Sequence, residues 1–300
     1  FPVKFDVLNE TNDTVLENVK LVIMCIDQEN TNFIEKCIEK GINYIDITAN
    51  NSFFEQIEKL HSKAVLNNVS ILLSVGLAPG ISNLLTKNSM NKLNNTKNID
   101  LFILLGLGEK HGDAAYKWTF DNIHNEYEIL NKFKKESIKS FSLAKKTNLE
   151  GNRTFYSFDF SDQHILARTI NVEKVLTRFA FDSKFLTATV GFFRKIGLTR
   201  IFKNETIQNL MLFTFKNIKL GSTIFAVKAV ATNKNKETYK SILKGYNESN
   251  ATAYMTIIST QEFLNKPFKA GVLHIHEIIS DIPEFLNRLR SFDKSILIEL

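Results

Sequence analysis

Several features that would assign a protein to a class are missing or scarce in this sequence of 300 residues. No apolar run approaches the ~18–20 residues of a membrane-spanning helix, and the apolar stretches have the roughly 4 to 8 residues typical of buried strands. The start, Phe1-Pro2-Val3-Lys4, lacks the charged-then-apolar layout of a secretory signal. Only two cysteines occur, Cys25 and Cys37, which we interpret as small core residues in a reducing compartment. A cytoplasmic globular protein is expected.

Recognised catalytic and nucleic-acid signatures are scarce too. We find no zinc-finger spacing, nucleophile elbow or P-loop, and no aromatic-basic pattern typical of RNA binding, so no nucleic-acid partner is expected. His274-x-His276-Glu277 resembles a pair of metal ligands, but a third ligand is not evident and no metal site is predicted. The net charge is +6, and lysines gather between 130 and 147. We interpret them as a solvated face, with a phosphate or anionic surface as the alternative.

What the sequence does contain is a regular alternation of strands and helices over its first eighty residues. Helices are expected at about 30–40, ended by Gly41, and at about 52–67. Short apolar strands separated by such helices indicate parallel βαβ units of a doubly wound sheet, in which ligands bind beyond the carboxyl ends of the strands. The expected strands are 19–25, 42–47 and 70–75.

After Pro79-Gly80 this rhythm changes to a mixed pattern, which predicts a second, α+β layer placed on the first. The helix predicted within 168–220 carries an apolar side that we interpret as a core or interface face, with a membrane-surface helix as the alternative. That side consists of Phe185, Leu186, Val190, Phe193 and Ile196. The other expected elements are helices at 81–93, 113–135, 250–264 and 283–291, a strand at 99–106, and a hairpin at 222–246.

The stretch LFILLGLGEKHGDAAYKW (101–118) raises the question of a dinucleotide-binding glycine loop, since Gly106, Gly108 and Gly112 follow an apolar run. Glu109 there would repel a pyrophosphate, and Trp118 lies where a helix hugging a strand needs small residues. The βαβ rhythm also precedes this loop and does not follow it. We therefore interpret the loop as a strand-to-helix corner that lines a cleft.

Three stretches together resemble the saccharopine dehydrogenase-like family of NAD(P)-dependent oxidoreductases: GINYIDITAN (41–50), GLAPGISN (76–83) and GLGEKHGDAAYKWT (106–119). TRFAFDSKFLT (177–187) and the segment from ATAYMTIISTQEFL to GVLHIHEII (251–279) are similar to it as well, in the same order. The resemblance implies an α/β fold with an incomplete Rossmann-type doubly wound parallel sheet and an inserted α+β domain. Residues 1–80 and about 265–300 would form the dinucleotide-binding domain, and 81–264 the substrate and dimerisation domain.

The same resemblance implies where the cofactor, NADP or NAD, binds. The family's phosphate loop belongs on a strand upstream of Phe1, and no glycine precedes Gly41, so we expect the N-terminal glycine-loop segment to be missing. Cys25-Ile26-Asp27 matches the place of the family's loop beside the nicotinamide, although the family's Gly-Pro is absent here. The implied cofactor-binding residues are Cys25, Ile26, Asp27, Thr48, Gly76, Ala78, Pro79 and Gly80.

For chemistry, the resemblance points to Asp46 and His111. Tyr44, Asp46 and Thr48 match the family's Tyr-x-Asp-x-Thr strand, but the Gly-Glu that follows in the family is Ala49-Asn50 here. Asp46 is expected to be catalytic or, alternatively, a turn acceptor. His111 is expected to be an acid–base group or, alternatively, a structural histidine.

The turn after Pro79-Gly80 contributes the last two candidates. Ser82 and Asn83 are expected to bind substrate, with capping of the following helix as the alternative.

The expected function is therefore hydride transfer between NADP(H) or NAD(H) and a carbon of a small molecule, at a carbon bonded to nitrogen, by a homodimer. Two alternatives stay open: a non-catalytic binding or assembly protein, and a protein that acts at a membrane surface through 185–220.

Overall fold

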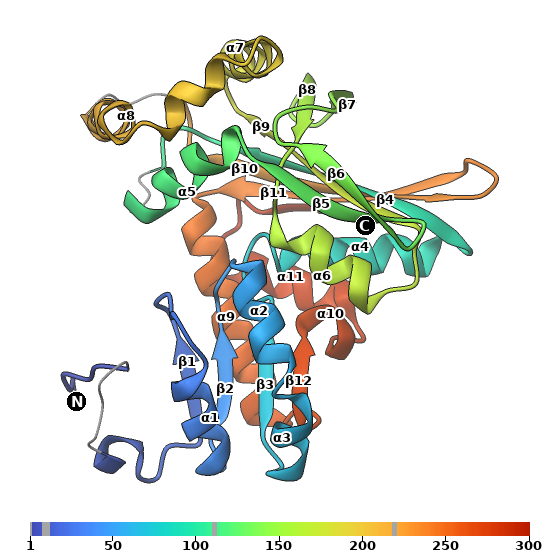
Figure 1. The fold of residues 1–300 in the computed structure, drawn as a ribbon. Coiled ribbons are helices and arrows are strands. Elements are labelled where there is room, and N and C mark those ends of the chain that lie inside the picture. The colour runs from blue at the N-terminus through green and yellow to red at the C-terminus, as the bar shows by residue number, and fades with distance from the viewer. Residues whose placement is uncertain (1, 8–12, 110–112, 218–220) are drawn as a thin grey trace.

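The computed structural model describes residues 2–7, 13–109, 113–217 and 221–300, which form two sheets with helices packed around and between them (Figure 1). The smaller sheet is entirely parallel, with the order β1-β2-β3-β12. Its strands are β1 (Leu21–Met24), β2 (Asn43–Asp46), β3 (Ser70–Leu73) and β12 (Gly271–His274). The predicted α/β class with a Rossmann-type parallel sheet is confirmed, and the fourth strand comes from the C-terminal part of the chain.

Helices α1 (Asn32–Glu39), α2 (Asn51–Glu58) and α3 (His61–Leu66) connect these strands. Gly41 follows α1 with a positive φ of 71°, as predicted for the end of that helix. The single helix expected at 52–67 is wrong, because the chain breaks at Lys59 and Leu60. The break brings His61 to the backbone of Val272 in β12, with 3.2 Å between His61 Nδ1 and Val272 N.

The larger sheet has nine strands and is mostly antiparallel. Its main path runs β13-β11-β10-β4-β9-β5-β6, and β8 joins β9 and pairs with β7. Only β4 and β9 in this sheet pair in parallel among the described residues. The strands are β4 (Thr96–Leu105), β5 (Glu126–Asn131), β6 (Lys134–Lys139), β7 (Lys145–Asn148), β8 (Asn152–Ser157), β9 (Lys174–Phe181), β10 (Ile224–Asn233), β11 (Thr238–Tyr246) and β13 (Leu297–Glu299).

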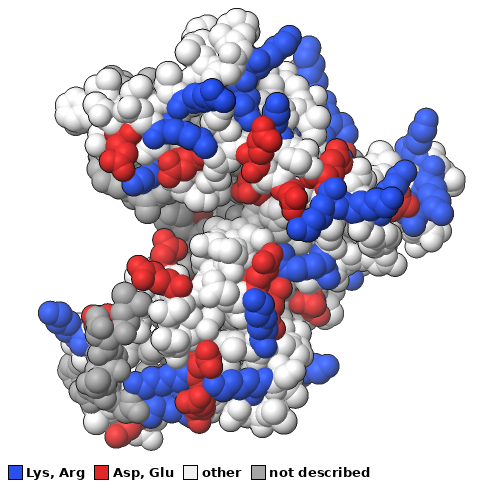
Figure 2. Space-filling view, viewed as in Figure 1, with Lys and Arg blue, Asp and Glu red and all other residues white. Residues whose placement is uncertain are grey.

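Two predicted helices in this region are correct only in part. The helix expected at 113–135 ends at Ile123, and residues 126–139 form the hairpin β5–β6. Its exposed lysines have acidic neighbours, as in the Lys135–Glu128 ion pair of 2.8 Å, and charges of both signs are interspersed over the face shown in Figure 2. Within 168–220, residues 174–181 form the buried strand β9, whose side chains alternate between two faces of the sheet, whereas residues 184–195 and 205–217 are helical as predicted.

The remaining helices fall into two groups (Figure 1). Helices α4 (Ile81–Lys92), α6 (Ser161–Thr169), α9 (Glu248–Asn265), α10 (Ile275–Ile278) and α11 (Ile282–Phe292) pack beside or between the two sheets. Helices α5 (Asp113–Ile123), α7 (Lys184–Lys195), α8 (Glu205–Asn217) and the 3-10 helix η2 (Leu198–Lys203) cluster at one end of the large sheet. A further 3-10 helix, η1 (Asp13–Leu16), precedes β1. None of the described helices is long and apolar enough to cross a membrane.

The apolar side expected at 185–196 is divided between two faces of α7. Val190 is buried and Leu186 packs against the same aromatic cluster, whereas Phe185 is 82% exposed and Ile196 is 57% exposed. Leu186 and Val190 are one helical turn apart and face the core, whereas Phe185 and Ile196 lie on another side. The prediction of a single apolar face therefore combined residues from two different faces.

A single hydrophobic cluster runs through both sheets. It includes Ile45 of β2 and Leu72 of β3, Leu84 of α4, and Val227 of β10, all 2% exposed or less. The predicted division at residues 80/81 and 264/265 stays a prediction, since α4 packs on strands of the large sheet and β13 pairs with β11.

Candidate functional site

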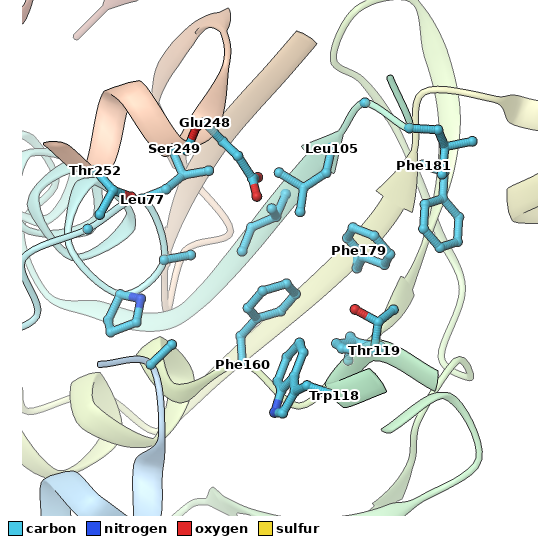
Figure 3. A pocket seen from close by; sticks show the side chains of 18 of the residues that line it. Leu77, Leu105, Trp118, Thr119, Phe160, Phe179, Phe181, Glu248, Ser249 and Thr252 are labelled. Carbon is cyan, nitrogen blue, oxygen red and sulfur yellow. The ribbon is translucent and has the colours of Figure 1, made fainter. Parts of the chain in front are cut away.

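A cavity of about 300 Å³ lies where the carboxyl ends of β2 and β3 meet the face of the large sheet (Figure 3). Beyond β2 it is lined by Ile47 and Ala49, and beyond β3 by residues 76–79. This is the position at which open parallel sheets bind ligands. From the large sheet and its helices it is lined by Ile103, Leu105, Gly106, Leu107, Trp118, Thr119, Phe120, Phe158, Phe160, Phe179, Phe181, Glu248, Ser249 and Thr252.

One wall of the cavity consists of aromatic rings in mutual contact. Trp118 of α5 packs on Phe160 at a centroid distance of 5.8 Å, Phe160 lies 6.0 Å from Phe179, and Phe179 lies 4.7 Å from Phe181. Phe179 and Phe181 project from the same face of β9 because strand side chains alternate between the two faces. This wall of the cavity is therefore formed by the face of the large sheet from which Phe179 and Phe181 project.

The first turn of α9 supplies the cavity's polar end. Glu248 points from the start of this helix into the cavity, opposite Phe160 and Trp118 (Figure 3). The buried carboxylate of Glu109 accepts hydrogen bonds from the backbone N–H groups of Glu248, at 2.6 Å, and Ser249, at 2.9 Å. Burial and the nearby Glu109 carboxylate raise the pKa of Glu248 to about 8. Glu248 is therefore largely protonated at neutral pH.

Asp46 lies at the end of β2, but on the other face of the sheet from Ile47. Its Oδ1 accepts from the N–H of Thr48 at 2.8 Å, and its Oδ2 accepts from the Tyr44 hydroxyl at 3.1 Å and the Gln28 amide at 3.2 Å. Burial raises the pKa of Asp46 to about 6 despite these bonds. The side chain does not line the described cavity, so its catalytic role stays a prediction, and the observed contacts are those of a turn acceptor.

The turn after β3 contains four of the residues expected to bind the cofactor, and three of them lie at the cavity. Gly76, Ala78 and Pro79 line the cavity. Gly80 does not, and it has a φ of 143°. A Cβ on Gly80 would lie 2.0 Å from the backbone oxygen of Gly76, so only glycine closes this turn.

Ser82 and Asn83 are fully buried in the first turn of α4. The Asn83 Oδ1 accepts from the N–H of Gly80 at 3.0 Å, and its amide nitrogen lies 3.4 Å from Nδ1 of His276. Neither side chain lines the described cavity. Their substrate-binding role stays a prediction that this arrangement does not support, whereas the capping alternative matches the Gly80 contact.

The residues that follow β1 are open to solvent. Cys25, Ile26 and Asp27 are exposed at the carboxyl end of this strand, and Ile26 has 59% of its surface accessible. In the described part of the chain β1 pairs only with β2, so these residues lie at an edge of the parallel sheet. Thr48 on the neighbouring strand end is buried, and its hydroxyl accepts from the N–H of Asn50 at 3.3 Å.

The glycine loop of 106–112 is not an open phosphate cradle in its described part. The N–H groups of Gly106 and Gly108 donate to Ile224 O and Ser222 O at 2.7 and 2.8 Å, and the N–H of Leu107 donates to Asp182 at 3.3 Å. In the described part of the loop, Gly106 and Leu107 line the cavity, as predicted for a corner beside a cleft. His111, the other predicted catalytic residue, lies outside the described residues.

His274 and His276 belong to a buried polar network. Nδ1 of His274 lies 2.7 Å from the Ser74 hydroxyl, and Nε2 lies 3.0 Å from Glu58. Glu58 also accepts from Arg168 of α6, at 2.6 Å. No group of three metal-ligating side chains occurs among the described residues. The network ties α2, β12 and α6 together.

No protein-family model matches the sequence, and no curated protein matches it. Among solved structures, apo saccharopine dehydrogenase (L-Glu forming) from Saccharomyces cerevisiae matches with a TM-score of 0.67 over 99% of this chain and 89% of that chain, at 14% identity. The chain has the fold of saccharopine dehydrogenase.

Two further structures are similar at lower scores. A meso-DAP dehydrogenase variant with DAP from Clostridium tetani E88 has a TM-score of 0.44 and 13% identity, covering 91% of this chain and 81% of that one. Amine dehydrogenase from Mycobacterium smegmatis has a TM-score of 0.42 and 7% identity, covering 87% of this chain and 76% of that one.

Sequence reasoning missed Glu248, Gln28 and the phenylalanines of the cavity wall. The alternation in the strand 174–181 was the available signal for Phe179 and Phe181, since residues two apart share a face. No local pattern marks Glu248, which reaches the cavity only because α9 packs beside the turn of Gly76.

Proposed function

We propose that this protein is an oxidoreductase that transfers hydride between NADP(H) or NAD(H) and the carbon of a C–N bond in a small molecule. The observation that carries the proposal is the apolar cavity at the carboxyl ends of β2 and β3 in a chain with the saccharopine dehydrogenase fold. Hydride chemistry needs such a water-poor site, because a reactive iminium carbon is otherwise hydrolysed.

The small residues that line the cavity at the ends of β2 and β3 fit a nicotinamide ring. Gly76, Ala78 and Ala49 present small side chains or none there, which leaves room for a flat ring between the strand ends and Trp118. Cys25 and Ile26, exposed at the same edge of the parallel sheet, are the residues that would contact the rest of the dinucleotide. When bound, the dinucleotide supplies or accepts the hydride.

The chain's own part in the reaction is orientation and proton handling. Glu248 reaches into the cavity, and its raised pKa lets one carboxyl group hold a proton at neutral pH and release it. We assign to it the proton that the substrate nitrogen gains or loses. His111 keeps its predicted acid–base role. The contacts of Asp46 fix the strand end from which Ile47 and Ala49 reach the cavity.

Trp118 makes the proposal directly testable, because it is the only tryptophan and lines the cavity. Reduced nicotinamide absorbs where tryptophan emits, so we expect NADPH or NADH to quench Trp118 emission in a saturable way. Gly76→Val, which adds a side chain to the lining of the cavity, should abolish the quenching, while Leu66→Ala, which shortens an 86% exposed side chain at the end of α3, should leave it unchanged. Saturable calorimetric binding must accompany the quenching. Binding of neither nucleotide would support the non-catalytic alternative instead.

The predicted homodimer is retained as part of the proposal. The exposed side of α7, with Phe185, Phe192 and Ile196, supports an interface within the region 81–264, since large apolar side chains cluster where proteins associate.

A further inference from the structure

A second cavity, which we call the polar pocket, adjoins the apolar cavity that contains Glu248 and has a similar volume of about 310 Å³. It lies where the start of α2 meets α5, β5 and α6. Ala49 and Trp118 line both cavities, so the two are neighbours. The indole nitrogen of Trp118 lies on the side of the ring away from Glu248 (Figure 3). A ligand that passes the Trp118 ring can therefore occupy both cavities.

One side of the polar pocket carries an imidazole–carboxylate pair at the start of α6. Nε2 of His164 lies 2.6 Å from Oδ1 of Asp159, and the two side chains are 18% and 29% exposed. The carboxylate orients the imidazole, and the ring of Tyr127 packs edge-on against it at a centroid distance of 6.3 Å. The described residues provide no hydrogen-bond partner for Oδ2 of Asp159 or Nδ1 of His164, so both atoms are available to a ligand.

The start of α2 forms another side of the polar pocket. Oδ1 of Asn50 accepts from the N–H groups of Ser52, at 3.0 Å, and Phe53, at 3.4 Å, and so caps the helix. The cap uses the oxygen of the Asn50 amide, and nothing in the described part of the chain accepts from its NH2 group, which remains a donor. The Ser161 hydroxyl donates to the backbone oxygen of Ala49, which ties α6 to the end of β2 and holds the two sides of the pocket together.

The polar groups of this pocket match the hydroxyl groups of a ligand. The Asp159 carboxylate accepts hydrogen bonds, and the Asn50 amide donates them. A hydroxyl does both, so adjacent hydroxyls of one ligand can donate to Asp159 and accept from Asn50. Hydrogen bonds to a carboxylate are about twice as strong as those between neutral groups. A ligand carboxylate or phosphate would instead lie beside the negative charge of Asp159, which repels it.

Resting on the proposed function, we propose that the substrate carries two or more hydroxyl groups, as a polyol or sugar does, and that these bind in the polar pocket at Asp159, His164 and Asn50. The carbon of the reacting C–N bond then lies in the apolar cavity, on the other side of Trp118. No bond of the hydroxyl-bearing part changes in the reaction. Its binding holds the reacting carbon in one orientation, which is how contacts remote from the chemistry promote a reaction.

The test divides a small probe between the two cavities. 3-Phenoxypropane-1,2-diol carries an apolar ring and two adjacent hydroxyls, whereas anisole has only the ring and glycerol only the hydroxyls. In calorimetric titrations of the full chain we expect the diol to bind at least about tenfold more tightly than either of them, because two hydrogen bonds join the contacts of the ring. Equal affinity for the diol and anisole would overturn the proposal.

A fourth probe, 3-phenoxypropanoic acid, replaces the hydroxyls by a carboxylate. We expect it to bind more weakly than the diol, because its charge has the same sign as that of Asp159. Tighter binding of the acid than of the diol would show that the polar pocket selects an anion, and the hydroxyl assignment would be wrong.

Two variants locate the hydroxyls. Asp159→Asn should reduce the preference for the diol over anisole to less than about threefold, because the charged acceptor is lost. Asn50→Asp keeps a helix-capping oxygen but removes the amide donor, and it should lower the preference in the same way. Asp281→Asn, at an exposed position that lines neither cavity, should leave it intact. If either pocket variant folds, as judged by circular dichroism, and keeps the full preference, the proposal is wrong.

Nucleotide titrations separate this inference from the function on which it rests. If NADPH binds but the diol shows no preference over anisole, the substrate class is wrong and the oxidoreductase proposal stands. If the diol binds with the expected preference and neither nucleotide binds, the polar pocket is a hydroxyl-binding site and the oxidoreductase proposal fails.

Discussion

Replacing Asp46 by asparagine is expected to stabilise the protein at neutral and alkaline pH. Asp46 is 1% exposed, and burial raises its pKa from an ordinary 3.8 to about 6. A carboxyl with a raised pKa contributes stability that is fully present below its unfolded pKa and lost as the pH rises to its folded pKa. Asp46 thus lowers the free energy of unfolding by about 3 kcal/mol between roughly pH 4 and 6, as two pKa units correspond to that energy.

The asparagine variant should lose this step because its amide does not ionise. Its Oδ1 can keep the bond from the Thr48 N–H, and its amide nitrogen can donate to Gln28, whose Oε1 is buried without a hydrogen-bond partner among the described residues. This needs a rotation of the Gln28 amide, after which its Nε2 is the atom without a hydrogen-bond partner, in place of its Oε1. We expect Asp46→Asn to equal the wild type within about 1 kcal/mol at pH 4 and to exceed it by about 1–3 kcal/mol at pH 8.

Urea unfolding followed by far-ultraviolet circular dichroism at both pH values measures the difference. Asp281→Asn is the control, since the N-cap of α11 is exposed and asparagine caps helices as well as aspartate does, so neither pH should show a change. A variant less stable than the wild type at pH 8 would show that the ionised Asp46 side chain stabilises the fold, which refutes the burial argument. A hundredfold loss of hydride transfer in a stable variant would support the predicted catalytic role of Asp46 instead.

Three further predictions follow from the packing. Gly80→Ala should destabilise the fold by at least about 3 kcal/mol, because its Cβ would overlap a backbone oxygen of the same turn, and a urea midpoint near the wild-type value would contradict this. Arg168→Met should cost about 2 kcal/mol in urea unfolding by leaving the half-buried Glu58 without its cation, whereas Arg168→Lys should recover part of that loss. Sedimentation velocity should show a homodimer that Phe185→Ser with Phe192→Ser converts to monomer; a wild-type monomer at micromolar concentration would exclude this interface.

The sequence allowed the parallel sheet to be predicted almost strand by strand, because β1, β2 and β3 are short apolar runs with helices of clear period between them. It failed where local preference and tertiary packing disagree. Residues 126–139 carry a helix-like mixture of lysine and glutamate but pair as a hairpin, and β9 has lysine and arginine within a buried strand. Cross-strand partners decide such segments, and one sequence does not show them.

The site was predictable to the same extent. Residues 76–79 line the cavity because a turn at the end of a parallel strand always faces the ligand side of the sheet, so the strand pattern alone places them. The strand pattern does not say which side chains at the end of β2 point into the cavity. Asp46 and Ile47 are adjacent, yet they lie on opposite faces of the sheet, and only Ile47 lines the cavity. Glu248 depends on how α9 docks some 170 residues after β3, which is a property of the whole fold.

The hydrophobic cluster that runs through both sheets has a consequence for how ligands enter and leave. Enzymes whose layers have separate cores can swing apart as a clamshell, but Ile45, Leu72 and Val227 lie in one continuous core here, and such a motion would expose it to water. Exchange with solvent then depends on local rearrangement at the cavity rim. We therefore expect ligands to exchange through side-chain and loop movements, which occur on the nanosecond to microsecond scale, and the two sheets to melt in one cooperative transition.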